Sequence, residues 1–223
     1  MKQKEPYQEL TKFKTDLQSR LKREFIRFTV IGFDELNVTT TKNLTKEAYS
    51  RLWKANLRDY RGIAREGRDF AKGMLTDSEK KRISDLDLAL IIAFVLSTYN
   101  IITGYRFDKE WERKRMRYAE EILAAKEASD RAYLTEMSKK NANLLLTQSM
   151  QGGIEVEDEA IKTVFKKAGI KKVKWVAEKD DITCSVCRDR DGKIYPVDSI
   201  PAKPHYNCRC YIVPYRETDS ESR

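Results

Sequence analysis

Residues 171–213 run KKVKWVAEKDDITCSVCRDRDGKIYPVDSIPAKPHYNCRCYIV, and this stretch sets the architecture of the C-terminal part of the chain. It contains all four cysteines and the single histidine of the 223 residues. These five side chains follow the spacing Cys184-x-x-Cys187, then seventeen residues, then His205-x-x-Cys208-x-Cys210. Two ligand pairs on separate turns can close around one metal ion, so the sequence predicts a metal site here.

Zinc is the metal that this set of side chains favours. Thiolate sulfur and imidazole nitrogen are its preferred donors, and a structural Zn²⁺ takes four of them in a tetrahedron. Five candidates compete for four positions, and we favour Cys184, Cys187, His205 and Cys208, with Cys210 as the substitute. Positions 208 and 210 would share one face of a strand, so both thiols could point at the ion. We therefore predict a structural zinc site.

The residues around the cysteines predict a small α+β domain. Alternation over residues 171–177 predicts a strand that places Val173, Trp175 and Ala177 on one side. The Asp191-Gly192 pair then predicts a hairpin turn after the second cysteine. A domain of about seventy residues is small enough to gain stability from a metal clip.

The first 150 residues are predicted to be helical. One apolar face recurs at spacings of three and four, and it consists of Leu10, Phe13, Leu17, Leu21 and Phe25. A second helix is expected to begin near Thr45, with a buried side formed by Tyr49, Leu52, Trp53, Leu57 and Tyr60. Between them, Gly32 and the Thr39-Thr40-Thr41 run are expected to interrupt the helical pattern.

Residues 107–150 contain neither proline nor glycine, which predicts one long helix. Its apolar stripe would consist of Trp111, Tyr118, Ile122, Ala125, Ala132 and Tyr133. Gly152-Gly153 is expected to end this helix and to mark the boundary between domains. The predicted fold class is therefore mainly α, with a long-helix region at 1–150, a small α+β zinc-binding domain at 151–216 and a polar tail at 217–223.

One apolar run, LALIIAFVLSTYNII at residues 88–102, is the best candidate for a membrane segment. It is shorter than the ~20 apolar residues that a spanning helix needs, and Asp85 and Asp87 lie at its start. We predict a buried core helix, capped by Ser84 or Asp85, and no stable membrane insertion. The N-terminus has no apolar run before a small-residue cleavage site, so we expect no secretory signal and synthesis in a reducing cytoplasm.

The charge balance favours a polyanionic partner. Lys and Arg number 44 against 35 Asp and Glu, a net charge of +9. The candidate nucleic-acid-binding residues form two groups, Lys171, Lys172 and Lys174 beside the predicted strand, and Arg113, Lys114, Arg115 and Arg117 on the long helix. Alternating lysines on a strand are equally compatible with an ordinary solvated surface.

Three alternatives to a structural metal site remain open. One or two disulfides are chemically possible. A thioredoxin-like redox pair would need Cys184 at a strand-to-helix junction, whereas the charged run at residues 188–192 indicates a turn. A metal-dependent nuclease would draw its acids from Glu178, Asp180, Asp181, Asp189 and Asp191. These carboxylates are more simply interpreted as turn formers and counter-charges, and the one imidazole is already assigned to the metal.

The order of these motifs resembles a known family. The matching positions are Trp175, Asp181, Cys184-x-x-Cys187, Asp191-Gly192, Pro201 and His205-Tyr-Asn-Cys208-Arg-Cys210. They are similar to the C-terminal signature of phage minor head proteins, the head morphogenesis or Mu F-like family. The resemblance covers residues 155–214, and the region before them matches in its general helical character.

This resemblance implies a minor capsid protein that acts in head morphogenesis at the portal vertex, with a role in DNA packaging or delivery. The implied partners are the portal protein, the major capsid or scaffolding protein, and packaged double-stranded DNA. The implied location is the virion, after synthesis in the host cytoplasm. The family supplies no catalytic residues for this region, so we expect no enzyme. A sequence-independent DNA-binding zinc protein is the alternative.

Overall fold

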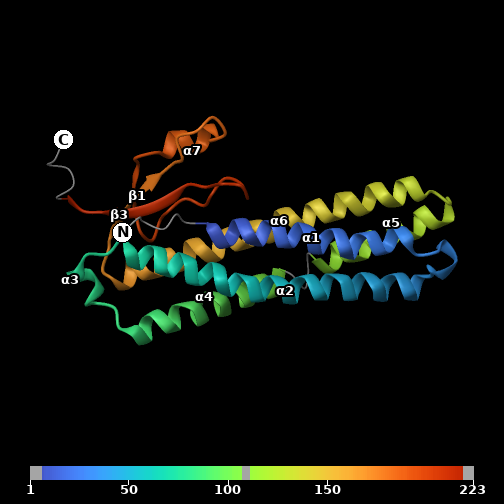
Figure 1. Cartoon of the computed structure of the whole chain (residues 1–223), viewed down its shortest axis with the longest axis horizontal. Helices are drawn as coiled ribbons and strands as arrows, with labels where there is room; N and C mark the ends of the chain where they lie inside the picture. Colours follow the sequence, from blue (N-terminus) through green and yellow to red (C-terminus); the bar gives the residue numbers. More distant parts are fainter. Residues whose placement is uncertain (1–6, 107–110, 218–223) are drawn as a thin grey trace. The chain divides into compact units, whose positions relative to one another are not determined.

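A computed structural model describes residues 7–106 and 111–217 of the chain, except for the side chains of residues 98–106. Its elements, in chain order, are α1 (Gln8–Val30), η1 (Phe33–Glu35), α2 (Val38–Gly73), α3 (Asp77–Lys80), α4 (Asp85–Arg106), α5 (Glu112–Glu127), α6 (Arg131–Lys167), β1 (Lys172–Val176), α7 (Ser185–Arg190), β2 (Ile194–Pro196) and β3 (Tyr211–Tyr215) (Figure 1). The prediction of a mainly helical chain with a small α+β part at its C-terminal end is confirmed.

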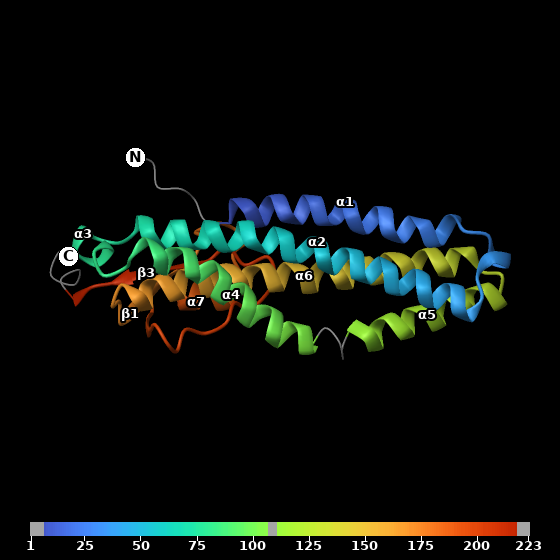
Figure 2. The ribbon, with the colours of Figure 1, turned by 90° about the horizontal axis from the view of Figure 1, so that it is seen from below.

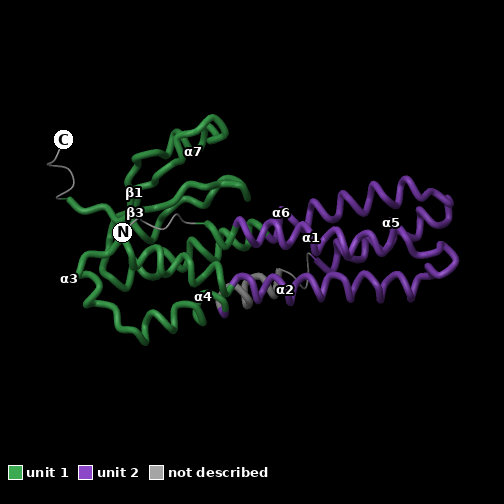
Figure 3. The backbone as a smooth tube through the Cα atoms, in the orientation of Figure 1, with its two compact units in different colours: residues 1–10, 61–96, 150–223 green, residues 11–60, 97–149 purple. Residues whose placement is uncertain are grey.

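The chain forms two compact units (Figure 3). The first unit contains Met1–Leu10, Arg61–Leu96 and Met150–Arg223, and the second contains Thr11–Tyr60 and Ser97–Ser149. The small sheet therefore shares its unit with parts of α2, α4 and α6. Residues 218–223 of the predicted tail lie outside the described residues.

The second unit is built from helices that lie side by side in both views, namely α1, α2, α5 and α6 (Figures 1 and 2). The predicted apolar face of α1 is buried along its whole length. On α5, Tyr118 is fully buried and its ring lies 5.4 Å from that of Phe25 on α1. A polar contact supplements this core, because Asn56 Nδ2 on α2 donates to Ser149 Oγ on α6 at 2.7 Å.

The predicted start of the second helix near Thr45 is wrong. Helix α2 begins at Val38, and the side chain of Asn37 accepts a hydrogen bond from the Thr40 amide at 2.9 Å. This cap gives the Thr40 amide a partner that it would otherwise lack, and α2 can therefore start before the threonine run. The three threonines that we expected to break the helix lie within α2. Thr45 is itself buried, and its hydroxyl donates to the Thr41 carbonyl at 3.0 Å.

The predicted helix end at Gly152-Gly153 is also wrong. Helix α6 continues through both glycines to Lys167, and both are buried. Glycine lowers helix propensity by only about 1 kcal/mol, which packing outweighs. Gly67 on α2 allows α2 and α6 to approach each other closely. A Cβ atom at this position would lie 2.7 Å from the Glu157 carbonyl oxygen, so the close approach requires glycine.

The single long helix predicted at 107–150 is instead two helices, and its proposed start at Phe107 lies outside the described residues. The break falls at Ser129, whose φ of 52° ends α5. The Asp130 amide donates to the Ala125 carbonyl at 2.9 Å, as in a helix-terminating motif, and the Asp130 carboxylate caps α6. Ala132 and Tyr133, which we placed on the same apolar stripe as Tyr118, are exposed.

Helix α4 is only half buried over its described side chains, which corrects the prediction of a core helix. Ser84 caps it as predicted, since its Oγ accepts from the Asp87 amide at 3.0 Å. Leu88, Ile91 and Val95 are buried, whereas the opposite side is exposed. No helix in the described part of the chain combines the length and hydropathy needed to cross a bilayer.

The sheet of the first unit has the order β2-β1-β3, and both pairings are antiparallel. The predicted alternation on β1 is confirmed, with Val173 and Trp175 buried on one face and Ala177 buried just beyond. The predicted hairpin is wrong in one arm, because residues 185–190 form α7. Gly192, with a φ of +74°, turns the chain so that its amide donates to the Trp175 carbonyl at 2.9 Å.

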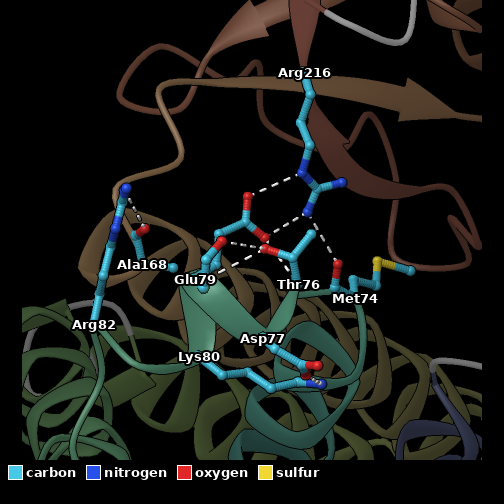
Figure 4. A network of polar contacts seen from close by, with 9 residues as sticks. Met74, Thr76, Asp77, Glu79, Lys80, Arg82, Ala168 and Arg216 are labelled. Atoms are coloured by element: carbon cyan, nitrogen blue, oxygen red, sulfur yellow. Dashed lines mark hydrogen bonds and ion pairs between the residues drawn. The ribbon is translucent and has the colours of Figure 1, made fainter.

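A polar network joins the end of β3 to α3 (Figure 4). The Arg216 guanidinium donates to both carboxylate oxygens of Glu79, at 2.9 and 2.6 Å, and to the Met74 carbonyl at 3.2 Å. Glu79 also closes a capping box with Thr76 at the start of α3. The hydrogen bond from Arg216 lowers the pKa of Glu79 to about 2.

We expect the Glu79→Gln variant to lose about 1 kcal/mol of unfolding free energy at pH 7, because both side chains remain partly accessible to solvent. A carboxylate with a lowered pKa stabilises the folded state above its unfolded pKa, here 4.5, and this contribution is lost as the pH falls toward about 2. Urea unfolding at pH 7, 5, 4 and 3 should therefore show the variant and the wild type converging. Asp77→Asn on the same helix is the control, and a difference that is constant with pH would contradict the prediction.

Candidate metal centre

Loop geometry before α7 positions the first two cysteines. Thr183 Oγ1 donates to the Glu178 carbonyl at 2.5 Å and contacts Asp180 Oδ1 at 2.8 Å, which folds the loop back on itself. Cys184 then caps α7, and its Sγ accepts from the Cys187 amide at 3.4 Å. Both sulfur atoms consequently lie on the same side of the first helical turn, and Cys187 is buried.

A second turn supplies the remaining candidate ligands. The Cys208 amide donates to the His205 carbonyl at 3.1 Å, and Cys208 and Cys210 are both buried. They lie just before β3, rather than on a strand as predicted. Arg209, between them, forms an ion pair with Asp180 at 2.5 Å, which ties this turn to the loop before α7.

All five predicted ligands come together in two overlapping groups. Cys184, Cys187 and His205 form one group, and Cys187, Cys208 and Cys210 form the other, with the ligand atoms of each group within 4.8 Å of one another. Cys187 is common to both. This cluster could hold a metal ion, and the fourth position can be taken by either Cys208 or Cys210.

The spacing of the sulfur atoms fits such an ion. Two thiolates bound to a tetrahedral zinc at 2.3 Å lie about 3.8 Å apart. The Sγ atoms of Cys187 and Cys208 are 3.5 Å apart. A disulfide would bring them to about 2.05 Å, and all four cysteines are free in this structure.

The thiols differ in how easily they ionise. Burial raises the pKa of Cys187, as do its hydrogen bonds with the other thiols, and burial also raises the pKa of Cys208. Burial is the largest single influence on Cys184 and opposes its ionisation. Hydrogen bonds from the Cys187 and Val186 amides and from the Cys187 thiol, together with the charge of Arg188, outweigh it and lower the pKa of Cys184. The buried thiols therefore ionise most readily when a cation lies among them.

One alternative gains from the structure on its main criterion. A redox pair requires its first cysteine at the start of a helix, and Cys184 does lie at the start of α7. The turn that we expected at 188–192 would have left no helix there. However, that helix has six residues and follows a loop, and Cys187 is surrounded by two further thiols. A group of this size favours metal binding over a two-cysteine redox pair.

The acids proposed for a nuclease have structural partners or face solvent. Asp180 bonds Thr183 and pairs with Arg209, and Asp191 Oδ1 accepts from the Ala177 amide at 2.9 Å. Glu178, Asp181 and Asp189 are exposed. Among the described residues, the groups with metal-binding spacing contain cysteine and histidine alone.

The cationic residues predicted on the long helix separate into two environments. Arg113, Lys114 and Arg117 line a hollow of about 560 Å³ in the second unit, together with Lys140 of α6 and with Glu121, which pairs with Arg117 at 3.2 Å. Arg115 instead is buried, pairs with Glu112, and donates to the Lys42 carbonyl at 3.1 Å. The Arg115 guanidinium is therefore engaged in contacts within the fold and is shielded from solvent.

The three lysines beside β1 lie away from the buried face. Lys171 precedes the strand, and Lys172 and Lys174 occupy the face opposite Trp175. Lys172 forms an ion pair with Glu217 at 3.2 Å. Lys171 and Lys172 are exposed and Lys174 is half-buried.

Sequence reasoning missed a buried polar cluster next to the cysteines. Lys203 forms an ion pair with Asp158 of α6 at 2.7 Å and contacts the Tyr7 hydroxyl, which donates to the Cys210 carbonyl at 2.6 Å. The Tyr7 amide donates to Glu157 Oε1 at 3.1 Å. No local pattern could reveal this cluster, because it joins positions that are nearly 200 residues apart.

Comparisons with protein-family models, curated proteins and solved structures found no match to this chain.

Proposed function

We propose that this chain is a minor head protein of a phage, a structural component that acts in head morphogenesis at the portal vertex. The observation that carries the proposal is the convergence of Cys184, Cys187, His205, Cys208 and Cys210, whose order in the chain resembles the family signature. The helices outside this site supply extended surface for contacts with a portal protein and with a major capsid or scaffolding protein.

The metal in this proposal is a structural Zn²⁺. Its preferred donors are the thiolates and the imidazole gathered here, and five candidates for four positions can fill its coordination shell. Catalysis would require an open position and a proton-transfer group beside it. The nearby carboxylates are engaged or exposed, so assembly is favoured over hydrolysis.

Co-expression with the portal protein of the same phage tests the proposal. We expect a complex that survives affinity purification and size-exclusion chromatography. Leu144→Glu, on the exposed side of α6 in the second unit, should weaken it, whereas the matched Ile182→Glu, exposed beside the cysteines, should not. Absence of any complex would contradict the proposal, as would metal-dependent DNA cleavage that Asp181→Ala abolishes without loss of metal.

Contact with packaged DNA is a second candidate function, favoured by the hollow lined by Arg113, Lys114, Arg117 and Lys140. Counterion release makes such binding sequence-blind and steeply dependent on salt. Lys171, Lys172 and Lys174 offer a second, smaller cationic surface. The virion location and both partner classes follow from the same proposal.

Reversing the charges of the hollow should weaken duplex binding and flatten its salt dependence. Each lost phosphate contact lowers the slope of log K against log salt by about 0.9, so Arg113→Glu/Arg117→Glu should lower it by about 2. Fluorescence anisotropy with a labelled duplex between about 50 and 200 mM salt measures both quantities. Lys172→Glu/Lys174→Glu tests the other surface, and an affinity independent of salt would contradict the prediction.

A further inference from the structure

Helix α4 carries an apolar ridge that nothing covers in the described part of the chain. Leu86, Leu90 and Phe94 are 69%, 53% and 58% exposed, although they are large apolar side chains. Their spacing of four residues places them in one row along the helix. Ala89 and Ala93, also exposed, lie beside this row, and their small side chains leave the row protruding from the helix surface. Isolated exposed leucines are common, but a continuous apolar row usually marks a contact surface.

A negative charge lies at the N-terminal end of this ridge. Asp85 is exposed at its N-terminal end, and no lysine or arginine occurs between Asp85 and Ser97. Asp87, one residue beyond Leu86, is held by Lys167 at 2.7 Å within the same unit. A partner surface for the ridge would therefore combine an apolar depression with positive charge beside it.

Such a surface is present on the second unit of the same chain. A groove of about 550 Å³ lies between α1 and α6. Its apolar lining comes from Leu21, Phe25 and Ile26 of α1 and from Ala142 and Leu146 of α6. Ile26 is exposed, whereas Leu21 and Phe25 are buried, so the apolar lining is open to solvent at Ile26.

Positive charge flanks this groove on both sides. Lys22 of α1 and Lys139 of α6 line it and are exposed. None of the residues that line the groove carries a carboxylate. The groove therefore complements the ridge in polarity, because it combines an apolar lining with positive charge.

We propose that the α4 ridge of one copy of this chain docks into the α1–α6 groove of a second copy. The side chains of Leu86, Leu90 and Phe94 enter the apolar depression, as ridges enter grooves between packed helices, and Asp85 approaches Lys22 and Lys139. The contact is heterologous, because the two surfaces that meet are different. Each copy then offers one free ridge and one free groove, so association continues into a ring or a filament.

Two matched double variants test the α4 ridge and the α1–α6 groove separately. Leu90→Glu/Phe94→Glu removes the ridge and keeps the groove, whereas Lys22→Glu/Ile26→Glu blocks the groove and keeps the ridge. The four replaced side chains are exposed and glutamate favours helix, so circular dichroism and thermal unfolding should match the wild type. Sedimentation velocity over a concentration series extending to several hundred micromolar is the measurement, since small interfaces form transient complexes.

The expected results are specific to a heterologous contact. The wild type should grow into oligomers with concentration, and each variant alone should remain monomeric. An equimolar mixture of the two variants should form a 1:1 pair that grows no further, because only one intact ridge and one intact groove can meet. Asp85→Lys should weaken wild-type association at least several-fold, and pairing that chain with a Lys22→Glu chain should restore part of it.

Three outcomes would overturn the proposal. A wild type that stays monomeric over the whole series would assign the ridge to a different partner. Self-association of the groove variant alone would indicate a symmetric ridge-to-ridge contact. Failure of the mixture to form a 1:1 pair, with both variants folded, would show that the ridge does not enter the groove.

Discussion

We expect the Cys187→Ser variant to bind no metal and to lose the folded structure of residues 172–215. Cys187 is the one residue that belongs to both ligand groups, so its loss removes a candidate ligand from each of them. Structural zinc contributes on the order of 10 kcal/mol in isolated zinc modules at pH 7, which is comparable with the whole stability of an ordinary domain. Hydrogen exchange should show fast-exchanging amides in the sheet, while α5 and the parts of α1 and α2 that belong to the second unit keep their protection.

A chelator added to the wild type should reproduce this exchange pattern, and elemental analysis of protein purified under reducing conditions should give about one zinc per chain. Val186→Ser, at an exposed position beside Cys187, is the matched control and should retain the metal. Comparing Cys208→Ser with Cys210→Ser identifies the fourth ligand, since only the variant of the non-ligand keeps the metal. Full protection of the sheet in Cys187→Ser would refute a stabilising metal.

The second large effect is expected at Lys203. Its side chain is 3% exposed, and its ammonium group lies 2.7 Å from Asp158 Oδ1. Replacing Lys203 with methionine leaves the Asp158 carboxylate without a cationic partner. Burial already raises the pKa of the neighbouring Glu157, and the charge of Lys203 opposes that rise. We expect the free energy of unfolding at pH 7, measured with urea, to fall by about 3 kcal/mol.

Two further variants show whether the lost charge causes this effect. Lys203→Met/Asp158→Asn should recover part of the stability, because the carboxylate without a cation is also removed. Lys162→Met, which breaks a more accessible pair with Glu159 on the same helix, should change stability by less than about 0.5 kcal/mol. Metal content should stay at the wild-type value in all three variants. A Lys203→Met variant as stable as the wild type would contradict the buried ion pair.

Periodic patterns were sufficient for much of the fold. The apolar row from Leu10 to Phe25 and the alternation of Val173 and Trp175 both correspond to buried faces. Such rows follow from the geometry of a helix or a strand, which repeats every few residues whatever the rest of the chain does. Where breaks were predicted, the sequence was a poorer guide, as Thr45 and Gly152-Gly153 show, because packing outweighs local preferences of about 1 kcal/mol.

The sequence by itself determined the helical character of the chain, the short strand β1 and the set of five side chains that could hold a metal ion, because each depends on neighbours within a few residues or on residue chemistry. Only the tertiary structure decided that Gly67 is required where α6 passes and that Lys203 pairs with Asp158 beside Tyr7. It also decided that Leu90 and Phe94 remain exposed. These features depend on which distant segments pack together, and that is set by the sum of many weak contacts rather than by any local pattern.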